Sequence, residues 1–95
     1  MSFEDGEYCS CCGYRTIGSE HAICVICGWE EDWYQAMNPD DDNGGTGMSL
    51  REAQKNFLTT GTVSPHYISR IPKPEKPEQY FERDPNWKPL PQTMP

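Results

Sequence analysis

Two short cysteine motifs constrain this chain more than any other feature. Each is a Cys-x-x-Cys-Gly sequence, at residues 9–13 and 24–28. Two residues between cysteines form a tight turn that aims both sulfurs at one point, and the glycine that follows permits unusual backbone dihedral angles. Two such knuckles facing each other complete a tetrahedral four-sulfur site. The spacing therefore predicts one structural zinc ion bound by the first and last cysteines of each motif, which are Cys9, Cys12, Cys24 and Cys27.

The size and the expected compartment of the chain favour a metal over disulfide bonds. A chain of 95 residues forms one domain that buries only roughly 60–65% of its unfolded surface, so the fold needs a covalent or metal staple. The residues after Met1 are acidic and resemble no signal peptide, and no stretch is long and apolar enough to span a membrane. We therefore expect a cytoplasmic protein, whose thiols stay reduced, and an odd cysteine count also fits disulfides poorly.

The identity of the metal leaves one alternative open. A tetrahedral site of four thiolates also suits mononuclear iron, as in rubredoxins, which would make the protein an electron carrier. Rubredoxins also have two CxxCG knuckles, but theirs lie much further apart along the chain. Zinc is therefore the predicted metal.

The fifth cysteine, Cys11, is predicted not to be a ligand. Superimposing the two motifs places Cys11 where Ile26 lies in the second one, which is an apolar position. We expect a small buried side chain beside the metal. A reactive thiol and a replacement ligand are the alternatives.

Local sequence signals predict a β-hairpin between the two motifs and one α-helix. Residues 14–17 have strand composition, residues 18–20 suit a turn, residues 21–23 would be the returning strand, and Trp29 would begin a third strand. A helix is predicted over residues 49–60, because Ser49 and Glu52 form a capping box and Gly61 stands at the expected end. Its apolar stripe should pack on the metal module, since a helix this short is unstable alone.

The rest of the chain divides into an acidic connector and a proline-rich arm. The connector covers residues 31–47 and is rich in turn-forming residues. The arm covers residues 65–95, holds eight of the nine prolines, and carries large apolar side chains that linkers rarely have. We expect it to wrap its own domain or a partner. The predicted fold is thus a small metal-stabilised α+β protein, with a zinc-ribbon-like module over residues 1–64 and an extended arm over 65–95.

The charge distribution excludes some partners and favours others. Residues 1–64 carry three basic and eleven acidic side chains, which gives −8, whereas residues 65–95 carry five basic and four acidic ones, which gives +1. An anionic module is repelled by phosphate backbones, so we expect neither nucleic acid nor membrane as a partner. A basic protein surface would suit it. The candidate partner-binding residues are the acidic and aromatic ones that cluster in one stretch, namely Glu30, Glu31, Asp32, Trp33, Tyr34, Asp40, Asp41 and Asp42.

Catalysis is not expected. Four thiolates leave a zinc ion no open position for a substrate or an activated water. Only two histidines occur, His21 and His66, and no recognised catalytic or phosphate-binding motif is present. The acidic stretch does not fit the spacing of an EF-hand calcium loop either.

Residues 9–57 resemble the bacterial CPCC family of small cysteine-rich proteins. The resemblance rests on the cysteine motifs with Tyr14 and with residues 29–32, on Gln35, Pro39, Asp40, Gly44 and Gly45, and on residues 49–57. The chain departs from the family pattern at Ser10 and Val25, where prolines are expected. The resemblance implies a zinc-ribbon-like module and brings no reaction with it. Residues 65–95 are expected to lie outside it.

A protein-binding role is the functional prediction. Its most specific form is an acidic immunity protein that neutralises a bacterial toxin by direct binding, since such inhibitors often present acidic faces to basic nuclease sites. A generic regulatory or adaptor zinc-ribbon protein is the main alternative. A nucleic-acid-binding zinc ribbon and a rubredoxin-like electron carrier are weaker ones.

Overall fold

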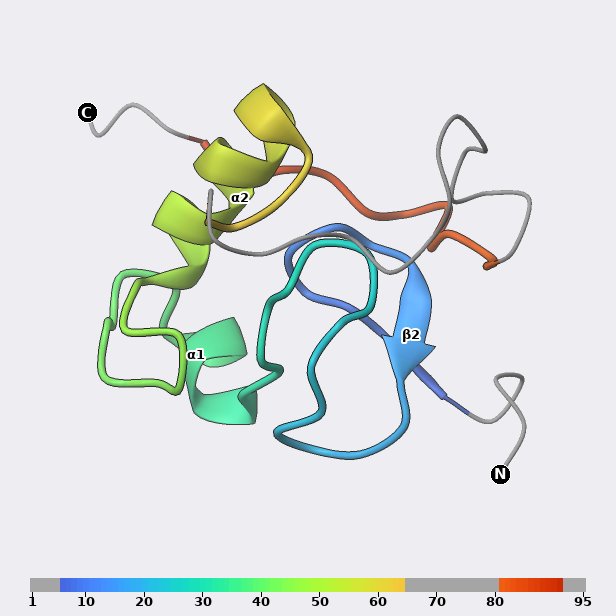
Figure 1. Cartoon of the computed structure of the whole chain (residues 1–95), viewed down its shortest axis with the longest axis horizontal. Coiled ribbons are helices and arrows are strands. Elements are labelled where there is room, and N and C mark those ends of the chain that lie inside the picture. The colour runs from blue at the N-terminus through green and yellow to red at the C-terminus, as the bar shows by residue number, and fades with distance from the viewer. Residues whose placement is uncertain (1–5, 65–80, 92–95) are drawn as a thin grey trace.

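The fold consists mostly of turns, with little regular secondary structure. A computed structural model describes residues 6–64 and 81–91 of the chain (Figure 1). Its elements are two short strands, β1 (Glu7–Tyr8) and β2 (Arg15–Ile17), and two helices, α1 (Trp33–Met37) and α2 (Leu50–Thr60). Neither described helix has the length and apolar character that a membrane crossing requires.

Strands β1 and β2 pair antiparallel, so the first cysteine motif lies in the loop between them. Glu7 faces Ile17 and Tyr8 faces Arg15, with an irregularity in register between the two pairs. The predicted pairing of residues 14–17 with residues 21–23 is therefore wrong. His21 adopts a left-handed backbone conformation with φ of 72°, which interrupts an extended strand at that point.

Residues 21–24 instead fold back on residues 29–31. The backbone N–H of His21 donates to the carbonyl of Glu31, and the N–H of Glu31 donates to the carbonyl of Ala22. Ile23 and Glu30 form an isolated antiparallel bridge rather than the third strand predicted at Trp29. Each cysteine motif thus lies at the tip of its own short antiparallel pair. A hairpin between the two motifs, as the sequence suggested, does not form.

Helix α1 was not predicted and organises the acidic connector. Asp32 caps it by accepting hydrogen bonds from the N–H groups of Tyr34 and Gln35. Gln35 is only 1% exposed, and its amide donates to the carbonyls of Asp41 and Met48. The connector therefore wraps around one buried glutamine, which explains how a segment with so few apolar residues is ordered.

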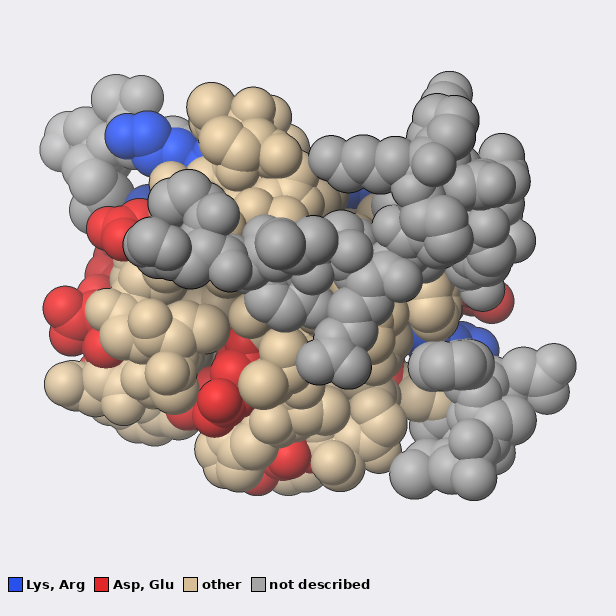
Figure 2. Space-filling view, viewed as in Figure 1, with Lys and Arg blue, Asp and Glu red and all other residues tan. Residues whose placement is uncertain are grey.

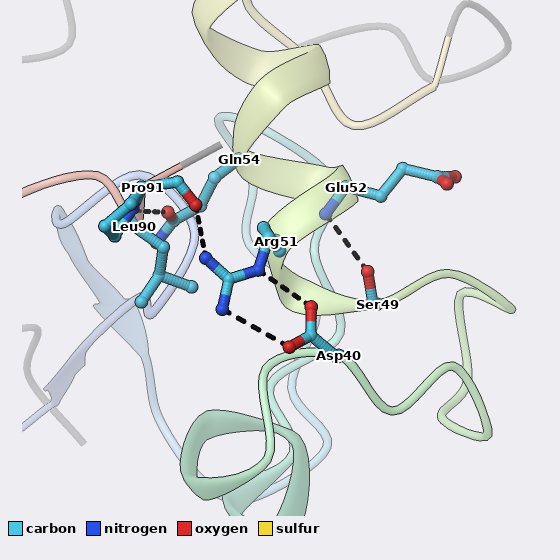
Figure 3. Close-up of polar contacts among 7 residues, drawn as sticks. All are labelled: Asp40, Ser49, Arg51, Glu52, Gln54, Leu90 and Pro91. Carbon is cyan, nitrogen blue, oxygen red and sulfur yellow. Dashed lines mark hydrogen bonds and ion pairs between the residues drawn. The ribbon is translucent and has the colours of Figure 1, made fainter. Parts of the chain in front are cut away.

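Helix α2 matches the predicted helix. The Ser49 side chain accepts from the N–H of Glu52 (Figure 3). Gly61 ends the helix in the left-handed conformation with φ of 91°. Leu50 and Ala53 are buried in the core. This core is one cluster built around the cysteines, and its other members are Tyr14, Ile17, Ile26, Trp29 and Val63.

The described part of the arm, residues 81–91, docks on its own domain. Its backbone pairs with the edge of β2, where the N–H of Arg15 donates to the carbonyl of Glu82 at 2.8 Å. Its far end reaches α2, where Gln54 accepts from the N–H of Leu90 at 2.6 Å (Figures 1 and 3). Wrapping of its own domain is thus confirmed for this segment. The other residues of the predicted arm, 65–80 and 92–95, which include His66, lie outside the described residues.

Candidate metal centre

The four predicted cysteines come together in the core. Their sulfur atoms all lie within 4.8 Å of one another, and all four residues are fully buried. The Sγ atoms of Cys9 and Cys27 are 3.7 Å apart, as are those of Cys12 and Cys24. Tetrahedral coordination with Zn–S bonds of about 2.3 Å separates the sulfurs by about 3.8 Å. The residues present therefore fit a tetrahedral metal ion.

The two cysteine motifs form matching turns. The N–H of Gly13 donates to the carbonyl of Cys9, and the N–H of Gly28 donates to that of Cys24. Both glycines adopt the left-handed conformation, with φ of 84° and 87°. Each turn is closed by a further backbone bond, in which the first cysteine donates to the carbonyl of Tyr14 or Trp29. The glycine in each motif is thus needed for the backbone path that brings the two sulfurs together.

Two donors support the sulfur of Cys24 directly. The hydroxyl of Thr16 in β2 lies 3.0 Å from this Sγ, and the N–H of Ile26 lies 3.4 Å from it. Both groups donate to sulfur, so they favour the thiolate form. Thr16 was missed in the sequence, where it read only as a strand residue.

The four clustered thiols have strongly shifted pKa values. Hydrogen bonds, first that from Cys12, hold the pKa of the Cys24 thiol far below its ordinary range. The hydrogen bond with Cys24 raises the pKa of Cys12, and burial raises that of Cys9. The pKa of Cys27 is also raised, chiefly by a hydrogen bond with Cys11. Burial and mutual repulsion disfavour several thiolates in one cluster, and a bound cation would stabilise them.

Cys11 lies beside the four-sulfur group and is not part of it. It is fully buried in the same core cluster as Ile26, its counterpart in the second turn. The predicted burial is confirmed. Its thiol raises the pKa of the Cys27 thiol, so Cys11 is a neighbour of one of the four clustered cysteines.

Ser10 anchors the first turn to the rest of the protein. Its N–H and hydroxyl donate to the carboxylate of Glu31 at 3.0 and 2.6 Å. Its carbonyl accepts from the side-chain amide of Gln54 at 2.9 Å and from the indole of Trp87 at 3.3 Å. Gln54, Trp87 and the supporting role of Glu31 were missed in the sequence, because these contacts link distant segments.

The candidate partner-binding residues do not all lie on the surface. Glu31 is 4% exposed, and burial raises the pKa of its carboxyl group. It therefore belongs to the interior and not to an acidic face. Asp32 caps α1, and Asp40 is exposed but forms an ion pair with Arg51 at 2.7 Å, which lowers the pKa of the Asp40 carboxyl group (Figure 3).

The remaining candidates surround α1. Trp33 and Tyr34 are 56% and 61% exposed, and Met37 on the same helix is exposed as well. Asp42 is exposed, whereas Glu30 and Asp41 are half-buried. Figure 2 shows acidic side chains at the left edge and the lower centre of the molecule, with basic side chains directly above them at the upper left.

Comparison with known proteins identifies the family. The sequence model of the family described as "Cysteine-rich CPCC" matches residues 7–78 of the 95-residue chain. The match extends beyond the expected end at residue 57 and into the first part of the arm, so the expectation that all of residues 65–95 lie outside the family was wrong. No curated protein and no solved structure matches the chain. Because the match covers most of its length and includes the four clustered cysteines, this chain belongs to the cysteine-rich CPCC family.

Proposed function

We propose that this protein is a non-catalytic, structural-zinc module that works by binding a protein with a basic surface. The metal-binding part of the proposal rests on the four buried sulfurs, which all lie within 4.8 Å of one another and include two pairs 3.7 Å apart. The binding half rests on the acidic–aromatic surface, defined as Glu30, Asp32, Trp33, Tyr34, Asp40, Asp41 and Asp42. Glu31 is left out of this surface because it is buried.

Zinc is the metal that suits this site best. Four thiolates close the coordination sphere, which gives a structural role and leaves no position for catalysis. The site lies in the only core cluster of the described residues, so metal binding and folding are expected to be coupled. An iron-bearing, rubredoxin-like electron carrier is the alternative, and it would give a coloured protein.

The acidic–aromatic surface has the composition of a docking site. Trp33 and Tyr34 project from a helix that a buried glutamine fixes in place, so they are large and pre-positioned side chains. Acidic groups around them would steer a basic partner and raise the association rate. In its most specific form the proposal is an immunity protein that binds the basic active site of a toxin. A generic regulatory or adaptor protein is the alternative form.

The first experiment identifies the partner and measures its kinetics. The protein is purified from its native host with its bound partners, and the association rate of the recovered protein is measured at several salt concentrations. Asp42→Lys is the test variant, because Asp42 is exposed and has no hydrogen bond or ion pair with another described residue. Glu52→Lys on α2 is the matched control, since it makes the same change of charge outside the surface.

The outcomes separate the candidate functions. Steering by the acidic–aromatic surface predicts that Asp42→Lys slows association several-fold and weakens its salt dependence, while Glu52→Lys has a smaller effect. If the two variants change the association rate equally, the acidic–aromatic surface does not steer the partner and only keeps the protein in solution. Tight binding to DNA at physiological salt, with no protein partner recovered, would favour the nucleic-acid alternative. The immunity form adds that co-expression rescues cells from the cognate toxin and that the Asp42→Lys variant rescues them less well.

A further inference from the structure

The segment 81–91, here called the C-terminal segment, binds the backbone of the first cysteine turn. The Nε of Arg83 donates to the carbonyl of Cys12 at 3.0 Å. The indole of Trp87 donates to the carbonyl of Ser10 at 3.3 Å, and the N–H of Asp84 donates to that of Gly13 at 2.8 Å. Three carbonyls in one short turn are therefore held by residues about seventy positions away in the sequence.

Aromatic rings hold the side chain of Arg83 in the orientation that this contact needs. Its guanidinium carbon lies 4.7 Å from the centre of the Tyr14 ring and 4.5 Å from the centre of the Trp87 ring. The planar cation therefore stacks on two π systems, which restricts its rotation. The fixed orientation directs Nε at the carbonyl of Cys12, a predicted metal ligand.

Trp87 packs directly on the glycine of the same turn. A Cβ atom at Gly13 would lie 2.6 Å from Cγ of Trp87, well inside van der Waals contact. The turn thus lacks a side chain at the point where the indole approaches. This close fit shows that the C-terminal segment and the first cysteine turn are shaped for each other.

The far end of the C-terminal segment is tied to the same turn through α2. The Oε1 of Gln54 accepts from the N–H of Leu90, while its Nε2 donates to the carbonyl of Ser10. Arg51 bridges Asp40 and the carbonyl of Pro91 (Figure 3). A single buried glutamine therefore joins the metal turn to the end of the segment.

The second cysteine turn is held differently. The carbonyl of Cys27 accepts from the N–H of Val63 at 2.8 Å, and Cys24 receives its donors from Thr16 and Ile26. The contacts of Arg83, Asp84 and Trp87 described above all reach the first turn.

We propose that the C-terminal segment is a clasp that controls metal release, with Arg83 and Trp87 as its positioning residues. This inference rests on the proposed metal site. A metal ion leaves a closed four-thiolate site only after ligands detach, and Cys9 and Cys12 move with the backbone of their turn. Holding the carbonyls of that turn therefore slows the opening that frees the ion. The clasp lies beyond residues 7–78, the part of the chain that matches the family.

Zinc transfer from the full-length, zinc-loaded protein to an excess of a chromogenic chelator tests the clasp. Arg83→Ala should release zinc about tenfold faster than the unchanged protein, which corresponds to about 1.4 kcal/mol. Arg83→Lys should also release zinc faster than the unchanged protein, because lysine keeps the charge but lacks the planar group that stacks on the rings and donates to the carbonyl. Trp87→Phe keeps a ring but loses the indole N–H, so it should accelerate release by a smaller factor.

Lys88→Ala is the matched control. It removes the same charge from the same segment, at an exposed residue that forms no hydrogen bond or ion pair with the described residues. It should leave the release rate unchanged. If Arg83→Ala does not fold, Arg83→Lys and Trp87→Phe still decide the question.

Two further readouts separate a clasp from general destabilisation. Release through local opening of the clasp should depend only weakly on low concentrations of urea, whereas release through global unfolding rises steeply with urea. The visible spectrum of the cobalt-substituted variants should still report four-thiolate coordination. Release rates equal to that of the unchanged protein in all Arg83 and Trp87 variants would overturn the clasp alone. If the unchanged protein binds no zinc, the proposed metal site fails, and the clasp fails with it.

Discussion

Ser10 donates two hydrogen bonds to the carboxylate of Glu31, one from its backbone N–H at 3.0 Å and one from its hydroxyl at 2.6 Å. The CPCC family pattern has proline at this position, which has no N–H to donate. The pair thus ties the first cysteine turn to the segment after the second one. In this chain, the serine that stands in place of the family's proline has a specific hydrogen-bonding partner, Glu31.

Restoring the proline should therefore destabilise the protein. Ser10→Pro removes both donors from a buried carboxylate, and hydrogen bonds to charged groups are worth about 1.5–3 kcal/mol each. We expect a loss of about 2–4 kcal/mol in the free energy of unfolding, measured by urea denaturation with zinc present. In a Glu31→Ala background the same substitution should cost much less. A full loss in both backgrounds would mean that the backbone angles, and not Glu31, disfavour proline.

The pKa of Glu31 predicts a pH dependence. Burial raises this pKa above the ordinary value, so the folded state binds the proton more tightly than the unfolded state. The contribution of Glu31 to stability is then greatest at low pH. It declines as pH rises from the ordinary glutamate value through the raised one.

Comparison with Glu31→Gln isolates this effect. The stability of Glu31→Gln relative to the unchanged protein should increase with pH across that window and level off above it. Competition between protons and metal is common to both proteins and cancels in the difference. A difference that stays constant with pH, or decreases, would show that Glu31 does not titrate as inferred.

Cys11 and Cys12 are adjacent and should respond in opposite ways to alanine. Cys11→Ala removes a small buried side chain and should keep its zinc, with a loss of about 1–3 kcal/mol. Cys12→Ala should lose the metal and most of the fold, because binding and folding are one event in such modules. Zinc content and far-UV circular dichroism measure both results. Loss of zinc from Cys11→Ala would place Cys11 among the ligands.

Two glycines of the acidic connector should also differ. A Cβ at Gly44 would lie 1.9 Å from Oε1 of Gln35, which is buried and held by two hydrogen bonds. A Cβ at Gly47 meets nothing within 4 Å, although φ is 76° there. Gly47→Ala should thus cost only the backbone strain of about 1–2 kcal/mol.

Gly44→Ala should cost more than Gly47→Ala and should also disturb α1. Overpacking of a buried site costs about 1–3 kcal/mol, and displacement of Gln35 would move Trp33 and Tyr34 with the helix. Thermal unfolding and the tryptophan fluorescence spectrum report the two effects. Equal stability of the two variants would show that Gln35 does not fix the connector.

Local patterns in the sequence predicted some of this structure well. The CxxCG turns and the capping box of α2 are short-range features in which neighbouring residues satisfy one another, so the clustered cysteines and residues 49–60 were found. The pairing of β2 was misassigned because strands of two or three residues carry no periodic signal. Helix α1 was missed because its inward side is a polar glutamine, and the pattern of apolar residues does not mark it.

The contacts that hold the first cysteine turn could not be predicted from local sequence patterns. Arg83, Trp87 and Gln54 reach the turn from distant positions, through backbone carbonyls that exist at every residue. A contact of this kind leaves no mark on spacing or hydropathy. The proline-rich arm was therefore expected to wrap something, but its site on the first cysteine turn could not be inferred.

The metal content of the purified protein tests the central claim most directly. Elemental analysis combined with native mass spectrometry should find one zinc ion per chain, and the Cys24→Ala variant should contain none. Removal of the zinc by a chelator should unfold the unchanged protein. A red protein that contains iron, or a folded protein that contains no metal, would contradict the account.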